Sequence, residues 1–287
     1  MYPSDEYFLY YRCASCSSLQ ISTIPTNLQS FYPSSYSPFS SPTQSLLTRN
    51  KLFFALLSKL PHQLALVFTT LFNPDQVVSF VSSTKLPRHS SILEVGCGSA
   101  SGLLSLFKLG FKNLTGTDAF IDPQYLKKLP FPAYSATLPP DSRLYDLIIL
   151  NHVFEHVEDP FSLLSQLKLL LAHDGVLCIL SPVANSLASH IFDSRWIQLD
   201  PPRHLNIPST TGLDKLASLI GLRVVSTIFN SSSFQFIGSV QALCGVSLLS
   251  ANSIYNGTPL SKMILALLSP VLALISYLLN LIGRGDQ

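Results

Sequence analysis

From Ser91 onward, short apolar runs alternate with amphipathic segments of ten to thirteen residues. The runs SILEVG, NLTGTD, YDLIILN and GVLCILSP indicate strands, and segments between them such as SGLLSLFKLG have helical periodicity. Strands that alternate with helices of this length form right-handed β-α-β units and a parallel sheet. The sequence therefore predicts an α/β fold with a Rossmann-like, doubly wound, mostly parallel sheet.

Three segments in the second half of this pattern predict further helices and a further strand. PFSLLSQLKLLLAHDG, residues 160–175, opens with proline and closes with Asp-Gly, which predicts a helix over its whole length. Further on, STTGLDKLASLIG predicts a helix with a Ser/Thr N-cap, and the apolar run LRVVSTIF at residues 222–229 predicts another strand.

The junction ILEVGCGSA carries the strongest ligand-binding signal. Gly96 and Gly98 allow a tight turn between strand and helix and let a ligand approach the backbone. Asp118 follows the next strand, 22 residues after Gly96, where a carboxylate can accept hydrogen bonds from both hydroxyls of a ribose. A dinucleotide fingerprint needs a third glycine where this chain has Ser101, so an NAD-dependent oxidoreductase is disfavoured. The alternative to a nucleoside site is a turn with a purely structural role.

Several ordered motifs resemble one family. ILEVGCGSA, TGTD, YDLIILNHVFEHVEDP, GVLCILSP and DPPRHLNIPSTTGLDKLASLIGLRVV are similar to class I S-adenosylmethionine-dependent methyltransferases. The type is the one with Glu-His-Val-x-Asp-Pro after strand four and a later Pro-Arg-His-Leu segment, and the resemblance covers residues 90–229. It implies a seven-stranded sheet that binds S-adenosylmethionine at the carboxyl ends of its strands.

The resemblance also implies roles for individual residues. Asp118 would hold the ribose, Asn151 would lie near the reacting methyl group, and Glu94 would support the glycine loop that faces the methionine part. Residues 133–140 (AYSATLPP) contain no acid for the adenine amino group, which implies apolar packing and backbone contacts there, or weak binding. The expected cofactor-binding residues are Glu94, Gly96, Cys97, Gly98, Asp118 and Asn151.

Three polar residues are candidates for acting on a small-molecule acceptor such as a sugar, a lipid-linked intermediate or a secondary metabolite. His204 and Arg203 lie in a Pro-rich loop, and His156 lies after strand four. Histidine is the commonest general base, which an acceptor hydroxyl or acidic carbon needs. The alternative is that these side chains only fix their loops. Trp196 is either an aromatic lid over the acceptor or part of the core.

Two constellations raise the question of a metal, and we expect none. His152, Glu155 and His156 are spaced to share one face of a helical turn, and some related quinone-pathway methyltransferases bind a metal with an acid-x-x-Glu-His pattern there. Cys13 and Cys16 resemble the second half of a small zinc ribbon, but a closed zinc site needs four ligands.

The segments around the core differ from it in composition. We expect an irregular N-terminal segment with a zinc-ribbon remnant (residues 1–45), a helical extension (46–89), the methyltransferase domain (90–229) and an apolar helical tail (230–287). Pro270 predicts that the uncharged run Met263–Ile282 forms two short helices rather than one membrane span. We also expect the last, antiparallel strand of the family's sheet to be missing, because only Gln287 follows Gly285-Asp286.

Composition narrows the classes of partner that the protein can bind. Charged residues make up only 12% of the 287 residues, and the net charge of +2 gives no field for nucleic acid. The absence of a basic, apolar leader and the apolar settings of Cys97, Cys178 and Cys244 favour a cytoplasmic, reducing location. The tail predicts either a cap on the acceptor site or peripheral membrane contact through residues 260–282. A catalytically silent binding or scaffold protein is the alternative function, and nothing in the sequence indicates an oligomeric state.

Overall fold

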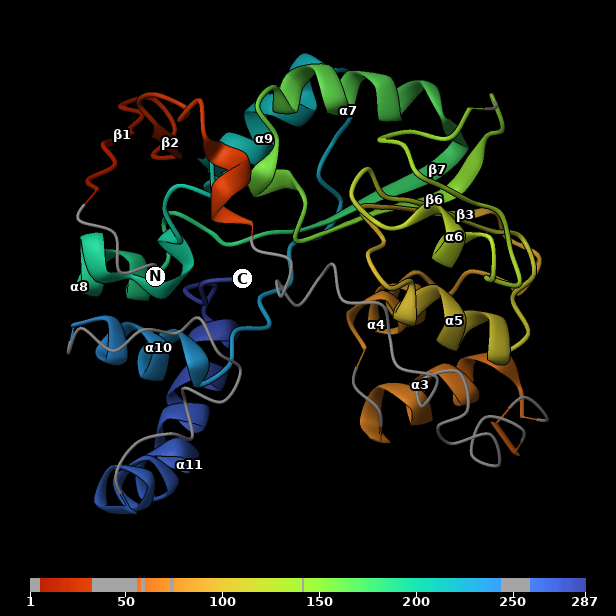
Figure 1. Ribbon diagram of the computed structural model, residues 1–287. Coiled ribbons are helices and arrows are strands. Elements are labelled where there is room, and N and C mark those ends of the chain that lie inside the picture. The colour runs from red at the N-terminus through yellow and green to blue at the C-terminus, as the bar shows by residue number, and fades with distance from the viewer. Residues whose placement is uncertain (1–5, 33–55, 58–59, 73–74, 141, 244–258) are drawn as a thin grey trace. The chain divides into compact units, whose positions relative to one another are not determined.

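The chain forms two compact units in a computed structural model (Figure 1). The sheet unit comprises Tyr32–Val153 and Ser162–Leu180, and the second unit comprises Met1–Phe31, Phe154–Phe161 and Ser181–Gln287. The predicted domain of residues 90–229 thus contributes to both units. The structure describes residues 6–32, 56–57, 60–72, 75–140, 142–243 and 259–287.

A five-stranded parallel sheet forms the centre of the sheet unit and confirms the predicted fold class. Its strand order is β5-β4-β3-β6-β7. The chain builds outward from β3 in one direction and then crosses over to build outward in the other. Doubly wound sheets bind ligands at such a switch point, beyond the carboxyl ends of the strands, which here is between β3 and β6. The strands are β3 (Ile92–Val95), β4 (Leu114–Thr117), β5 (Ala133–Tyr134), β6 (Tyr145–Asn151) and β7 (Leu171–Leu180).

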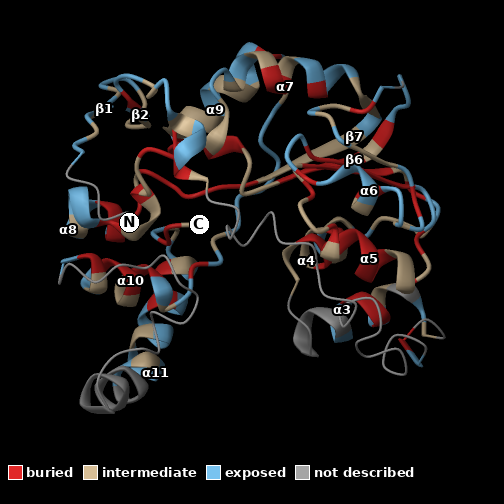
Figure 2. Cartoon of the chain, viewed as in Figure 1, coloured by how far each residue is buried: buried red, intermediate tan, exposed pale blue. Residues whose placement is uncertain are grey.

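Helices cover this sheet, and their apolar side chains form its core (Figure 2). Leu103 of α5 and Leu114 of β4 are fully buried, as are Leu66 of α3 and Val78 of α4. Residues 46–55 of the predicted helical extension lie outside the described residues. The helices are α3 (His62–Phe72), α4 (Gln76–Thr84), α5 (Ser101–Lys108), α6 (Pro123–Leu126) and most of α7 (Pro160–Leu169).

The boundary between α7 and β7 differs from the predicted one. The helix ends at Leu169 rather than at Asp174-Gly175, and β7 begins at Leu171. Tyr145 at the start of β6 pairs with Leu171 and donates its backbone N–H to Leu170 O at 2.8 Å. The strand β7 therefore runs through Asp174-Gly175, which lie in a register shift between the pairs Tyr145–Leu171 and Leu147–Val176.

The second unit combines a small antiparallel sheet with helices. The sheet order is β1-β2-β8, and the predicted Ser N-cap of α9 is present, because Ser209 Oγ accepts a hydrogen bond from Gly212 N at 2.8 Å. The strands are β1 (Tyr10–Arg12), β2 (Leu19–Ile21) and β8 (Asn206–Ile207). The helices are α8 (Leu187–Phe192), α9 (Thr210–Leu219), α10 (Phe234–Leu243) and α11 (Pro259–Leu281), with 3-10 turns at η1 (Leu28–Phe31), η3 (Phe154–His156), η4 (Asp193–Arg195) and η5 (Ile197–Leu199).

Residues 222–229 do not form the predicted strand. They run as irregular backbone, and most of them are exposed. An apolar run becomes a strand only when a neighbour pairs with it, and among the described residues the parallel sheet ends at β7. Within the part of the chain that the structure describes, the parallel sheet therefore has five strands, not the seven that the resemblance implies.

Residues 263–281 of the apolar tail lie in one continuous helix, so the expected break at Pro270 is wrong. Pro270 lies inside α11, which has 23 residues. Proline removes one backbone donor and crowds the preceding turn, but the remaining turns of a long helix keep their hydrogen bonds. Within the described part of the chain, no helix has the length and apolar character needed to cross a membrane.

Candidate functional site

The first position of the loop after β3 requires glycine. Gly96 has φ +68°, in the left-handed region. A Cβ atom on Gly96 would lie 2.4 Å from Val153 Cγ2, so a side chain there has neither the backbone conformation nor the space that it needs. The Cys97 N–H donates to Thr117 O at 2.9 Å, which holds the loop against the end of β4. The loop therefore exposes backbone rather than side chains at the carboxyl end of β3.

Asp118 is the residue that fixes this loop. Its side chain is only 7% exposed, and its Oδ2 accepts a hydrogen bond from Gly98 N at 3.0 Å. Oδ1 accepts from Phe120 N at 2.8 Å and from Ile121 N at 3.1 Å. The carboxylate thus links the end of β4 to the glycine loop. This positioning role was not visible in the sequence, and the ribose contact stays a prediction.

Glu94 brings a buried carboxyl group to the same place. It is 4% exposed, and its Oε2 has no hydrogen-bond partner among the described residues. Burial, followed by the charges of Asp75 and Asp118, raises the pKa of Glu94 well above its usual range. Asp75 caps α4 by accepting hydrogen bonds from Val77 N and Val78 N, and burial raises its pKa too. Three carboxyl groups therefore gather around the loop, an arrangement that favours a cationic ligand.

Cys97 lies between the two glycines, and its thiol is buried. Burial, then Glu94 and Asp118, raises the pKa of its thiol above the usual value. A buried, protonated thiol is inert, so its contribution to the loop is packing. Cys178 is half-buried, and burial raises its pKa to about 11; Cys244 lies outside the described residues.

Asn151 ends β6 next to the glycine loop. Because Val95 pairs with Leu150, the first residue after β3 and the last residue of β6 meet at one edge of the sheet. The Oδ1 atom of Asn151 is buried without a hydrogen-bond partner among the described residues. An unsatisfied buried acceptor is costly, and a bound donor at this edge would satisfy it.

The predicted acceptor-side residues lie in the second unit and contact one another. Arg203 and His204 are both buried, and the Arg203 guanidinium holds both carboxylate oxygens of Asp200. The rings of His156 and His204 meet edge to face with centroids 4.8 Å apart. Burial, then the neighbouring His204, lowers the pKa of His156 to about 4. Sequence spacing did not indicate this network, because 47 residues separate His156 from Arg203.

The spacing of His152, Glu155 and His156 does not give the expected helical turn. The turn η3 begins only at Phe154, and His152 precedes it with a left-handed φ of +54°. Trp196 is 1% exposed, and its Nε1 donates to Asp286 Oδ2 at 3.3 Å. Of the two roles considered for Trp196, the structure supports core packing.

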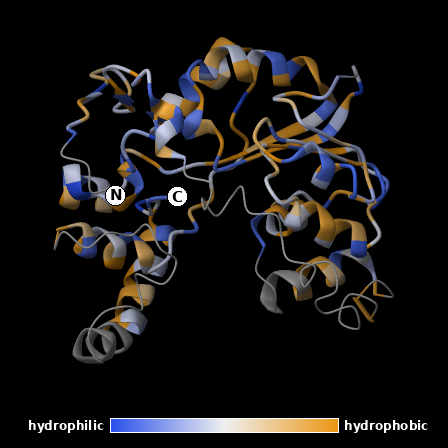
Figure 3. Cartoon of the chain, in the orientation of Figure 1, coloured by the Kyte–Doolittle hydropathy of each residue, from blue (hydrophilic) through white to orange (hydrophobic). Residues whose placement is uncertain are grey.

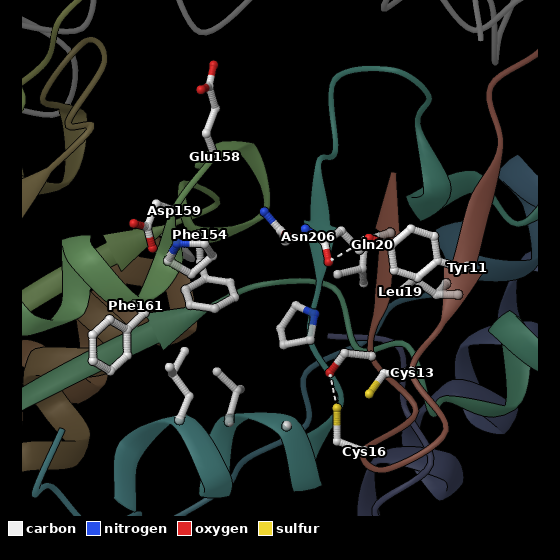
Figure 4. Close-up of a pocket in the computed structure, with 17 residues that line it drawn as sticks. Tyr11, Cys13, Cys16, Leu19, Gln20, Phe154, Glu158, Asp159, Phe161 and Asn206 are labelled. Atoms are coloured by element: carbon white, nitrogen blue, oxygen red, sulfur yellow. Dashed lines mark hydrogen bonds between the residues drawn. The ribbon is translucent and has the colours of Figure 1, made fainter. Parts of the chain in front are cut away.

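A cavity of about 400 Å³ opens in the second unit (Figure 4). Phe154 and Phe161 line it from one side and Cys13 and Cys16 from the β1-β2 hairpin, and neither His156 nor His204 is among its described lining residues. A hydrogen bond with the Ser15 hydroxyl, followed by bonds to nearby backbone, lowers the pKa of Cys13 to about 7. The cavity has the size of a small-molecule site.

Comparison with known proteins decides the family. Residues 64–227, more than half of the chain, match the family described as methyltransferase domain. The chain belongs to this methyltransferase family. No curated protein matches the sequence.

Several solved methyltransferases are similar in fold. Coclaurine N-methyltransferase bound to N-methylheliamine and SAH is 15% identical, with a TM-score of 0.42, over 80% of this chain and 75% of that chain. A putative sarcosine dimethylglycine methyltransferase from Galdieria sulphuraria is 17% identical, with a TM-score of 0.45, over 69% and 76%. A SAM-dependent methyltransferase from Archaeoglobus fulgidus is 21% identical, with a TM-score of 0.44, over 77% and 95%.

In this methyltransferase, the sheet brings the expected cofactor residues to one edge. Gly96, Asp118 and Asn151 follow or end three strands that lie side by side, and Glu94 lies beneath the loop. Sequence reasoning missed Asp75, which enters the cluster from the helical extension. Its only signal was an N-cap pattern, an Asp before the apolar run of α4.

Proposed function

We propose that the chain is an S-adenosylmethionine-dependent methyltransferase that acts on a small-molecule acceptor. The observation that carries the proposal is the meeting of the glycine loop, Asp118 and Asn151 at the switch point between β3 and β6. Membership of the methyltransferase family supports the same reaction class.

The charges at this edge suit S-adenosylmethionine. The cofactor carries a positive sulfonium and a positive α-ammonium group, and it would lie beside Glu94 and Asp118. The unpartnered Oε2 of Glu94 and Oδ1 of Asn151 are acceptors that a cationic or N–H-bearing ligand satisfies. The exposed backbone of the glycine loop allows close approach of the methionine part.

S-adenosylmethionine supplies the methyl group in an in-line displacement, so the protein mainly orients two reactants and excludes water. In the proposed arrangement, Asp118 orients the ribose and fixes the loop, and Asn151 borders the reacting centre. The roles of Arg203, His204 and His156 at the acceptor stay a prediction, as does a cytoplasmic location. Residues 133–140 contain no acid for the adenine amino group, which keeps a catalytically silent binding or scaffold protein as the alternative.

Calorimetric titration tests the proposal. We expect saturable binding of S-adenosylmethionine and of S-adenosylhomocysteine, each at one molecule per chain, and no heat with NAD. Absence of heat with both nucleosides would overturn the cofactor assignment. Binding without transfer of radiolabelled methyl to any acceptor in a broad screen would favour the silent alternative.

We also propose that the tail contacts a membrane surface. The described side chains of α11 are largely apolar and exposed (Figure 3). Leu274, Leu278 and Leu281 are each more than half exposed, and in sequence the uncharged run Met263–Ile282 is flanked by Lys262 and Arg284. An apolar helix with basic flanks binds at a lipid interface.

The Leu274→Glu/Leu278→Glu double variant is expected to bind vesicles of phosphatidylglycerol and phosphatidylcholine at least fivefold more weakly than the wild type. Two charges on the apolar face oppose insertion and repel anionic lipid. Co-sedimentation measures the bound fraction. Leu219→Glu, on an exposed leucine of α9, is the matched control and should bind as the wild type does. A wild-type protein that stays in the supernatant would contradict membrane contact.

A further inference from the structure

Three side chains of types that bind metals converge in the second unit. The expected cofactor residues belong to the sheet unit. Glu155, His156 and His204 each offer a ligand atom, and these atoms all lie within 4.8 Å of one another. Glu155 and His156 come from the turn η3, and His204 comes from the loop before β8. The Leu205 N–H donates to Glu155 O at 2.7 Å, so backbone pairing joins the two segments that carry the three side chains.

Hydrogen bonds to backbone carbonyls orient both imidazole rings. His156 Nδ1 lies 2.9 Å from Arg203 O, and His204 Nδ1 lies 2.7 Å from Gln198 O. A carbonyl oxygen can only accept, so each Nδ1 is the donor, and in the neutral ring Nε2 carries the lone pair. Histidine ligands of metals are held in this way, with the other ring N–H donated to a carbonyl or a carboxylate.

The surroundings of His204 favour a cation. Its Nε2 lies 3.9 Å from Asp200 Oδ2, beyond hydrogen-bond distance, and both atoms are electron-rich when the ring is neutral. The Arg203 guanidinium donates hydrogen bonds to Asp200, which balances the negative charge of Asp200 and keeps its carboxylate in place. Glu155, which is fully buried, adds a second carboxyl group to the cluster.

We propose that Glu155, His156 and His204 bind a divalent transition-metal ion, with Zn²⁺ as the best match. Two imidazoles and one carboxylate form a zinc ligand set that leaves one coordination position open, and imidazole nitrogen favours zinc over magnesium. Ligand distances of about 2.0–2.1 Å require the three atoms to draw in to roughly 3.3 Å from one another. The proposed site departs from our sequence-based expectation of no metal, and it uses His204 where the sequence pattern offered His152.

Cobalt titration of the full chain tests this site without ambiguity from the thiols. The Cys13→Ser/Cys16→Ser background removes two soft ligands that share a loop. In it we expect one Co²⁺ per chain, visible absorption typical of a four-coordinate nitrogen and oxygen site, and no sulfur charge-transfer band. Zn²⁺ should displace the Co²⁺ and raise the Tm, because an ion that binds only the folded state stabilises it.

His204→Gln in the same background should weaken Co²⁺ binding by at least about 100-fold, more than loss of a supporting residue costs. The matched control is His190→Gln, because His190 is exposed and also places its Nδ1 against a carbonyl, Ser186 O, at 2.7 Å. Circular dichroism establishes that each variant folds. If His204→Gln does not fold, the parent protein decides the matter. A parent that shows neither the absorption nor a Tm increase with excess metal overturns the proposal, and so does a folded His204→Gln that binds as the parent does.

Discussion

Asp118→Asn is expected to weaken S-adenosylmethionine binding at least tenfold, a loss of about 1.4 kcal/mol or more. The native carboxylate accepts three backbone hydrogen bonds, from Gly98, Phe120 and Ile121. Asparagine has one acceptor oxygen, so its NH₂ group must face at least one of these N–H donors. The variant therefore loosens the glycine loop and removes the charge that the ribose hydroxyls would bind.

Calorimetry measures this change in affinity, and thermal unfolding measures its cost to the fold. Asp122→Asn is the matched control. Asp122 caps α6 by accepting from Gln124 N at 2.9 Å, but it is exposed, so its variant should bind the cofactor as the wild type does. A folded Asp118→Asn protein with an affinity within twofold of the wild type would show that Asp118 serves neither the ribose nor the loop.

The parts of the fold that follow from local pattern were predictable. Buried strands such as β6 and the turn at Gly96 depend on residues close in sequence, whose periodicity and backbone preferences are direct signals. The predictions that failed concern strand pairing or helix length. Residues 222–229 have strand-like composition without a strand to pair with. Pro270 is a strong local signal for a helix break, but the long helix α11 continues through it.

In the candidate site, too, local sequence predicts some features, whereas others depend on tertiary packing. Asp118 and Asn151 could be located because Asp118 directly follows a strand and Asn151 ends one, and parallel strands end at a common edge. The positioning bonds of Asp118 and the approach of Asp75 to Glu94 depend on packing between segments distant in sequence. The contact of His156 with His204 also requires η3 and the loop before β8 to meet. No spacing rule within one segment contains that information.

Glu94→Gln is expected to stabilise the protein at pH 8 by about 2 kcal/mol. The reason is that burying a charged group costs more free energy than burying a neutral one. The pKa of Glu94 in the folded state is raised well above 4.5, its ordinary value. The folded state therefore holds this proton more tightly than the unfolded chain. Stability from Glu94 is complete below pH 4.5 and is lost as the pH rises through the folded-state pKa. Glutamine keeps the shape and has no such loss, so the advantage of the variant should shrink toward pH 4.5.

Urea unfolding at several pH values measures this difference, with Glu158→Gln, on an exposed carboxylate, as the control that should change nothing. Equal stabilisation at pH 5 and pH 8 would contradict a buried, titrating Glu94. The same variant should bind S-adenosylmethionine more weakly, because the carboxylate that costs stability in the unliganded protein is the one that we propose to lie beside the cofactor's positive charges. A gain in stability joined to a loss of affinity would identify Glu94 as a residue whose burial serves binding at the expense of the fold.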